Sequence, residues 1–119
     1  MYDNKHIARL LKVLSVETRV EMLRLLKGQA LCVNALAARL NLTPGAISQH
    51  LRIMRNAELV IDEKRGYYVH YRLNEKTLAV WQGAIEKLLN PKSGVNPTKK
   101  GTQKCAAVMK NKVVKNRKT

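Results

Sequence analysis

The sequence predicts a mainly α-helical domain that carries one small β-hairpin. Apolar side chains recur at the spacing of a helix face in five separate segments. Two β-prone runs flank the turn-forming segment Lys64-Arg65-Gly66. The chain has no Phe and one Trp, so Leu, Val, Ile, Ala and Met must build its core, which favours packed helices.

The charge of the chain points to a polyanionic partner. Its 119 residues suit one typical domain, so we expect no second independent core. It has 23 Lys and Arg against 8 Asp and Glu, and this net charge of +15 favours nucleic acid or an acidic membrane surface. No apolar run approaches the ~20 residues that cross a bilayer, and the start MYDNKH lacks a secretory pattern. We therefore expect a cytoplasmic protein with no membrane partner.

The positive charge is distributed unevenly along the chain. Residues 1–90 carry 14 basic and 8 acidic residues, whereas residues 91–119 carry 9 basic and none acidic. Pro and Gly interrupt the start of the second segment, and its like charges repel one another. We predict one domain over residues 1–90 and a basic, flexible tail over residues 91–119. Cys32 and Cys105 lie far apart and are expected to be free thiols in a reducing compartment.

Two helices are predicted near the start of the chain. Their apolar faces consist of Ile7, Leu10, Leu11 and Leu14, and then of Val16, Val20, Leu23 and Leu26. Gly28 ends the second helix, and Ser15 is the expected N-cap between the two.

A very short third helix and a longer fourth helix follow. The apolar positions of the third are Leu36, Ala37 and Leu40. Thr43 and Pro44 then supply an N-cap and a first-turn proline, so a fourth helix is predicted from there to about Ala57.

A hairpin and a last helix complete the domain. In the second strand of the hairpin an apolar set, Val69, Tyr71 and Leu73, is expected to point inward, and a polar set, Tyr68, His70 and Arg72, outward. The last helix begins at the cap residue Asn74 and ends before Pro91. Its apolar face is Leu78, Trp81, Ile85 and Leu88.

This order of elements is the plan of a winged helix-turn-helix, a DNA-binding fold. On the fourth helix Ile47, Leu51 and Met54 fall within one arc and are expected to dock on the domain. The opposite arc carries Gly45, Ser48, Gln49 and Arg52. Gln and Arg can bind adenine and guanine edges, Ser can bind base or phosphate, and Gly lets the backbone approach closely.

The residues predicted to contact double-stranded DNA lie on this helix and on the hairpin. They are Thr43, Gly45, Ser48, Gln49, His50, Arg52, Lys64 and Arg65. For the helix, the alternative is a merely solvated face, against which the order of elements and the charge both argue. Lys64 and Arg65 are expected to reach phosphate or the minor groove, and a solubilising role stays equally open for each. His50 flanks the buried arc, where packing or a phosphate contact is favoured over metal ligation.

Four stretches of the sequence, taken in order, carry a family resemblance. SVETRVEMLRLL, ALCVNALAARL, TPGAISQHLRIMRNAELV and GYYVHYRL resemble the second helix, helix-turn-helix and wing of the ArsR/SmtB family of bacterial and archaeal repressors, over about residues 5–90. The resemblance implies a two-fold dimer formed by the first and last helices, with each protomer reading half of an inverted repeat. The residues available for that dimer seam, meaning the dimer interface, are Ile7, Leu10, Leu11, Leu14, Leu78, Trp81, Ile85 and Leu88. Some of them must instead be buried in the core of the protomer.

The resemblance also implies a place for a metal or metalloid. Arsenic-sensing members carry Cys-Val-Cys where this chain has Cys32-Val33-Asn34, and soft thiolates bind thiophilic ions. Asn34 cannot replace a thiolate, so a three-sulfur site requires Cys105 or a cysteine from elsewhere. The last helix also lacks the Asp, His and Glu pattern of the zinc-sensing members. We favour Cys32 as a small buried apolar residue and keep a thiophilic metal or metalloid at Cys32 as the alternative.

The sequence therefore predicts a dimeric, sequence-specific DNA-binding regulator, a repressor released by an unidentified signal. The alternative is a nucleoid-type architectural protein with largely sequence-independent binding, which the charge supports and the Gln49/Arg52 face argues against. We expect no enzymatic activity, because the sequence offers no paired carboxylates, no nucleophile with a base and no phosphate-binding Gly loop.

Overall fold

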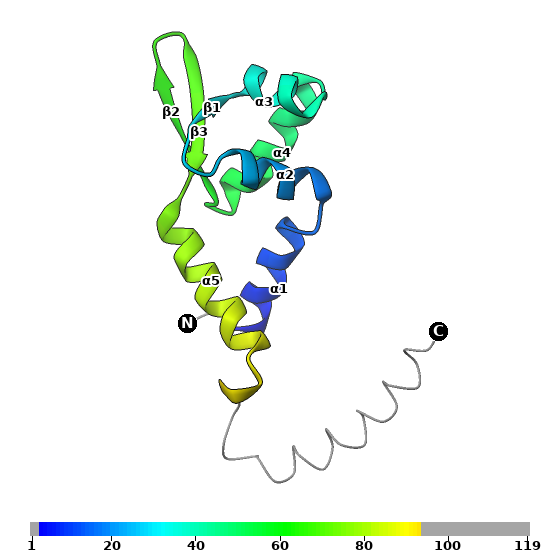
Figure 1. The fold of residues 1–119 in the computed structure, drawn as a ribbon, viewed down its shortest axis with the longest axis vertical. Coiled ribbons are helices and arrows are strands. Elements are labelled where there is room, and N and C mark those ends of the chain that lie inside the picture. The colour runs from blue at the N-terminus through cyan, green and yellow to red at the C-terminus, as the bar shows by residue number, and fades with distance from the viewer. Residues whose placement is uncertain (1–2, 94–119) are drawn as a thin grey trace, which may run out of the picture. The chain divides into compact units, whose positions relative to one another are not determined.

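The computed structural model describes residues 3–93, in which five α-helices accompany a three-stranded sheet (Figure 1). The elements in chain order are α1 (Asn4–Val13), α2 (Glu17–Leu25), β1 (Leu31–Cys32), α3 (Val33–Leu40), α4 (Pro44–Asn56), β2 (Val60–Arg65), β3 (Tyr68–Leu73), α5 (Glu75–Leu89) and the 3-10 turn η1 (Pro91–Ser93). The predicted five helices and hairpin are confirmed. In Figure 1 the hairpin β2–β3 projects from the end of the fold opposite to α1.

Local capping explains where several helices begin. The Thr43 Oγ1 accepts a hydrogen bond from the Ala46 N–H at 3.1 Å, and Pro44 occupies the first turn of α4. The Asn74 Oδ1 accepts from the Lys76 N–H at 3.2 Å at the start of α5. Both caps are as predicted.

The cap predicted at Ser15 is wrong. The residue at the N-cap position of α2 is Val16, which makes no side-chain capping bond. The Ser15 hydroxyl instead donates to the carbonyl of Lys12 at 2.8 Å, a local bond that short hydroxyl side chains make readily. Ser15 therefore closes α1 and does not open α2.

The sheet contains a strand that the sequence did not predict. β1 is two residues long and pairs antiparallel with β3, so the strand order is β1-β3-β2. Two residues are too few for an alternating pattern to be visible in the sequence. Cys32 pairs with His70, and His70 is half-buried although it was expected to point outward.

The hairpin turn begins two residues later than predicted, and is one residue shorter. Arg65 is the last residue of β2 and pairs with Tyr68, so the turn consists of Gly66 and Tyr67. Gly66 has a φ of +64°, in the left-handed region that glycine adopts without steric cost. Of the predicted inward set, Leu73 is buried, Tyr71 half-buried and Val69 exposed, so only the base of the hairpin is covered.

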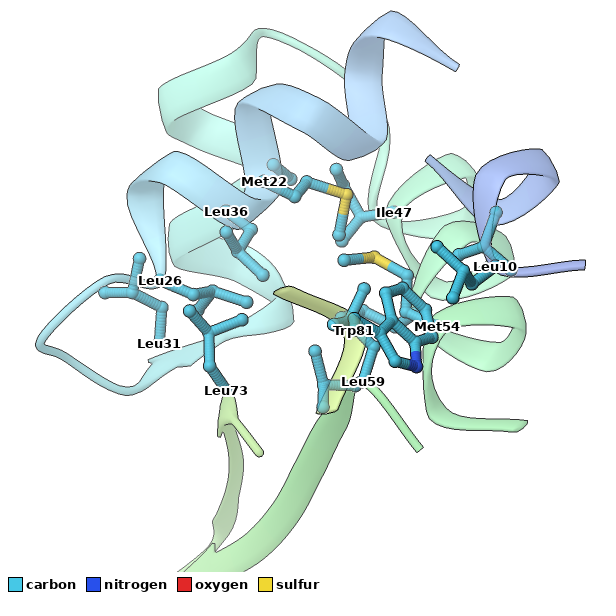
Figure 2. Packing of buried hydrophobic residues seen from close by; sticks show 14 residues of the cluster. Leu10, Met22, Leu26, Leu31, Leu36, Ile47, Met54, Leu59, Leu73 and Trp81 are labelled. Carbon is cyan, nitrogen blue, oxygen red and sulfur yellow. The ribbon is translucent and has the colours of Figure 1, made fainter. Parts of the chain in front are cut away.

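All the helices contribute to one apolar core (Figure 2). Its fully buried side chains are Met22, Leu26, Leu36, Ile47, Leu51, Met54 and Leu59. In Figure 2 the Trp81 ring lies toward Met54 and Leu59, with Leu10 nearby. Full burial of a Leu, Ile or Met side chain contributes about 1.5–3 kcal/mol to the free energy of folding. The described residues include no buried polar or charged side chain, so burial of apolar surface holds these elements together.

Within the part of the chain that the structure describes, residues 3–86 form one compact unit, which contains α1 to α4, the sheet and most of α5. The predicted basic tail lies almost wholly outside the described residues, as does Cys105, so the boundary at residue 90 stays a prediction. Within residues 3–93 no helix is long and apolar enough to span a membrane.

Candidate nucleic-acid interface

Helix α4 has one buried side and one exposed polar side. Ile47, Leu51 and Met54 are buried in the core. The structure exposes the three side chains on the other arc, Ser48, Gln49 and Arg52, which we call the reading face. An α-helix presented in this way fits the width of a DNA major groove, where its exposed side chains can contact base edges.

The first turn of α4 is open to close approach. Thr43 uses its hydroxyl oxygen to cap the helix, so the hydroxyl is already engaged as an acceptor. Gly45 is exposed, and a Cβ added to it would meet only Thr43 Oγ1, at 4.0 Å. Packing within the protein therefore does not require glycine at this position. Because Gly45 has no side chain, the sugar-phosphate backbone of DNA could approach the helix closely here.

His50 lies beside the reading face but is half-buried and already has a partner. The Arg19 Nε donates a hydrogen bond to His50 Nδ1 at 3.2 Å. Partial burial, and secondarily the positive charge of Arg19, lower the pKa of His50 below its ordinary value. The ring is therefore neutral at pH 7, with Nδ1 as the acceptor and the proton on Nε2. Of the two roles expected for His50, the structure gives a packing contact; a phosphate contact stays a prediction.

The basic residues of the hairpin sit beside an acidic one. Lys64 and Arg65 are both exposed and lie at the end of β2, and as neighbours on a strand they face opposite sides of the hairpin. Glu63 accepts a hydrogen bond from Arg72 Nε at 2.7 Å, and Arg65 Nη2 lies 3.5 Å from its other oxygen. The Arg72 hydrogen bond is the main reason that the pKa of Glu63 is lowered. Glu63 thus offsets part of the positive charge on the side of the hairpin that carries Arg65. Lys64 lies on the opposite side of the hairpin.

Two features of the interface escaped the sequence analysis. Tyr67 stands at the hairpin tip with 97% of its surface exposed, and a turn placed at Gly66-Tyr67 would have revealed it. Arg55, in the last turn of α4, lies 3.5 Å from Asp62 of β2, a pairing between elements that no local pattern signals.

The residues predicted for a dimer seam separate into three groups. Leu11 and Leu88 are exposed, and Ile7, Leu14, Leu78 and Ile85 are half-buried. Leu10 and Trp81 are 2% and 5% exposed, so they are buried in the core of the protomer. A side chain covered by its own protomer has almost no area left for a partner, and Val80, 48% exposed on α5, offers more.

Cys32 is a half-buried free thiol at the N-terminal boundary of α3. Among residues 3–93 no three His, Cys, Asp or Glu side chains lie close enough together to hold a metal ion. A thiophilic ion at Cys32 would need further sulfur ligands from outside this part of the chain.

Comparison with known proteins places this arrangement in a family. The model of the bacterial regulatory protein arsR family matches residues 17–62, from α2 into β2. The transcriptional repressor SdpR of Bacillus subtilis is 35% identical over 79 residues, which cover 66% of this chain and 84% of SdpR. The arsenical resistance operon repressor of Escherichia coli is 40% identical over 78 residues, covering 65% of this chain and 66% of that repressor.

A solved structure agrees with the sequence matches. The crystal structure of a possible transcriptional regulator for arsenical resistance has a TM-score of 0.63 and 34% identity, and the likeness covers 70% of this chain and 86% of that one. The capped reading helix, the wing that follows it and these likenesses lead to one conclusion. The chain belongs to the arsR family of bacterial regulatory proteins.

Proposed function

We propose that this protein is a cytoplasmic repressor that binds an inverted repeat in double-stranded DNA as a homodimer. The observation that carries the proposal is the exposed reading face of Ser48, Gln49 and Arg52, opposite the buried Ile47 and Met54. A rigidly anchored helix can hold these side chains at fixed positions relative to base edges. Gln suits adenine and Arg suits guanine, each through two hydrogen bonds.

The wing supplies contacts to the DNA backbone. Lys64 and Arg65 are exposed cations on opposite sides of the hairpin, and Tyr67 at its tip is free to pack on sugar or phosphate groups. Contacts of this kind fix the register of a protein on a duplex without specifying sequence. The wing therefore adds affinity, and the reading face adds specificity.

Exposed apolar residues on α1 and α5 support the homodimer. Leu11 and Val80 are 42% and 48% exposed, and a second protomer packed on α1 and α5 would cover these apolar side chains. A two-fold dimer places two copies of α4 on one side of a duplex, each in its own half-site. A signal that changes the relative position of the two α4 helices would weaken DNA binding. The coupling free energy between signal and DNA is typically about 1–3 kcal/mol.

A sequence-independent architectural protein is the second candidate, and the net charge of +15 favours it. To separate the two, duplexes that bind the protein are selected from a random library and sequenced. The protein is then titrated on the selected duplex and on a scrambled duplex across a salt series. Our proposal predicts an enriched inverted repeat and at least about a 1,000-fold preference for it at physiological salt. Equal affinities on both duplexes at every salt concentration would establish the architectural function instead.

A further inference from the structure

Arg19 connects three helices of the domain. It lies in the first turn of α2, and its Nη1 donates a hydrogen bond to the carbonyl oxygen of Val13, the last residue of α1, at 3.1 Å. Its Nε donates a second hydrogen bond to Nδ1 of His50 on α4, at 3.2 Å. A guanidinium is planar and rigid, so the two bonds together restrict both distance and angle. One side chain thereby holds the end of α1 and the middle of α4.

Both acceptors suit a cationic donor. The last carbonyl groups of a helix have no partner within the helix and carry the negative end of its dipole. The neutral His50 ring offers a lone pair on Nδ1, which a protonated ring does not have. Arg19 and His50 are both half-buried, so water competes less for these bonds than at an exposed site. Charge-assisted hydrogen bonds of this kind are stronger than neutral ones.

The position of His50 gives the contact a consequence for DNA binding. His50 adjoins Gln49 on α4 and precedes Arg52 by two residues. Because α4 is a continuous helix, a hydrogen bond that holds His50 also constrains where the reading face points, in addition to the buried contacts of Ile47 and Met54. α1 is one of the two helices of the proposed dimer seam, so the same contact relates the reading face to the partner protomer.

We propose that Arg19 is a positioning residue that fixes α4 relative to α1 and so sets the half-site spacing that the dimer accepts. The inference rests on the proposed function, because a half-site spacing is defined only for a dimer on an inverted repeat. A dimer in which α4 can pivot still attracts phosphates, but its two reading faces no longer keep one fixed separation.

The test uses the full chain, four single variants and one double variant. Arg19→Met keeps an unbranched apolar stem and removes both donors, and His50→Phe keeps a ring and removes the acceptor. His50→Asn restores an acceptor oxygen close to the position of Nδ1. Arg24→Met is the matched control, because Arg24 is an exposed cation of the same helix for which the described structure records no side-chain hydrogen bond or ion pair. Circular dichroism at the titration temperature checks that each variant is folded.

The main readout is the dependence of binding on half-site spacing. Each protein is titrated on the inverted repeat selected by the wild type, on repeats one base pair longer or shorter between half-sites, and on a scrambled duplex. We expect Arg19→Met and His50→Phe each to lose about ten-fold affinity for the selected repeat. Both should also discriminate less between spacings. Arg19→Met should keep its affinity for the scrambled duplex, and His50→Phe should lose there only what a phosphate contact from His50 contributes. His50→Asn and Arg24→Met should both keep the spacing preference, and the double variant Arg19→Met/His50→Phe should lose little more than either single variant.

Other outcomes overturn the inference in distinguishable ways. If Arg19→Met weakens binding to all duplexes equally, Arg19 contacts phosphate and does not position α4. If both single variants keep the spacing preference of the wild type, the contact has no role in positioning. If Arg19→Met does not fold, the comparison of His50→Phe with His50→Asn still tests the inference. Only His50→Phe, which lacks the acceptor, should lose the preference for one half-site spacing. If the wild type itself shows no preference among duplexes, the proposed function has failed and not merely this inference.

Discussion

The guanidinium of Arg55, in the last turn of the reading helix, lies 3.5 Å from the carboxylate of Asp62 in β2, measured from Nε to Oδ1. This ion pair joins the end of α4 to the strand that leads into the wing. Both side chains reach solvent, and exposed pairs of this kind contribute little to folding. The negative charge of Asp62 would nevertheless weaken the attraction between Arg55 and a phosphate of bound DNA.

Replacing Asp62 by Asn should therefore affect DNA binding more than stability. We expect the free energy of unfolding to change by less than about 1 kcal/mol in urea titrations. Affinity for both selected and scrambled duplexes should rise, because Arg55 becomes available to the DNA backbone. A drop in affinity for the selected duplex would instead show that Asp62 orients Arg55 for binding.

Acid should destabilise the folded protein through His50. Partial burial and Arg19 lower the pKa of His50 in the folded state, whereas in the unfolded chain it keeps the ordinary value near 6.5. The unfolded state then binds more protons, so this contribution to stability is complete above pH 6.5 and is lost as the pH falls through the folded-state pKa. Urea unfolding at pH 7.5, 6.5 and 5.5 should show a steeper loss of stability for the wild type than for His50→Asn. Parallel losses in the two proteins would remove His50 as the cause.

Trp81 and Val80 should affect different properties although they are neighbours. Trp81→Ala removes a buried ring from the core of the protomer and should cost about 3–5 kcal/mol of unfolding free energy. Val80→Lys places a charge on an exposed position of α5, and should weaken the dimer in sedimentation without altering the stability of the protomer. A monomeric but fully stable Trp81→Ala variant would return Trp81 to the seam and contradict this assignment.

The basic tail should bind phosphate without reading sequence. Removing residues 92–119 deletes nine basic residues and no acidic one. Every phosphate that the truncated protein no longer neutralises should reduce the slope of log affinity against log salt by about one unit. Preference for the selected over the scrambled duplex should hold or improve, because the reading face is untouched. The salt series compares full-length and truncated protein, and identical slopes would show that the tail stays off the DNA.

Most of the correct predictions rest on signals between residues close together in the sequence, namely helix caps and the periodicity of apolar residues. Thr43-Pro44 and Asn74 mark the starts of α4 and α5 because a cap acts within three residues of itself. The period of Ile47, Leu51 and Met54 identifies the buried side of α4 for the same reason. The exposed side, and with it the reading face, follows from geometry alone.

Contacts between distant segments could not be predicted. Arg19 and His50 are 31 residues apart, and nothing near either residue indicates the other. β1 exists only because β3 lies beside it, so a two-residue strand leaves no pattern of its own. Trp81 and Leu88 share one face of α5, yet the first is buried and the second exposed, because periodicity shows which residues face together and not what covers them.

The measurement closest to the central claim compares Gln49→Ala and Arg52→Ala with the wild type on the selected inverted repeat and on a scrambled duplex. Each variant should lose about 1–3 kcal/mol of binding free energy on the selected repeat, because a hydrogen-bonding group for a base edge is removed. Binding of Gln49→Ala to the scrambled duplex should stay unchanged, and that of Arg52→Ala should fall only by the effect of removing one charge. Equal losses on the two duplexes would contradict the account, since α4 would then contribute charge to DNA binding and read no sequence.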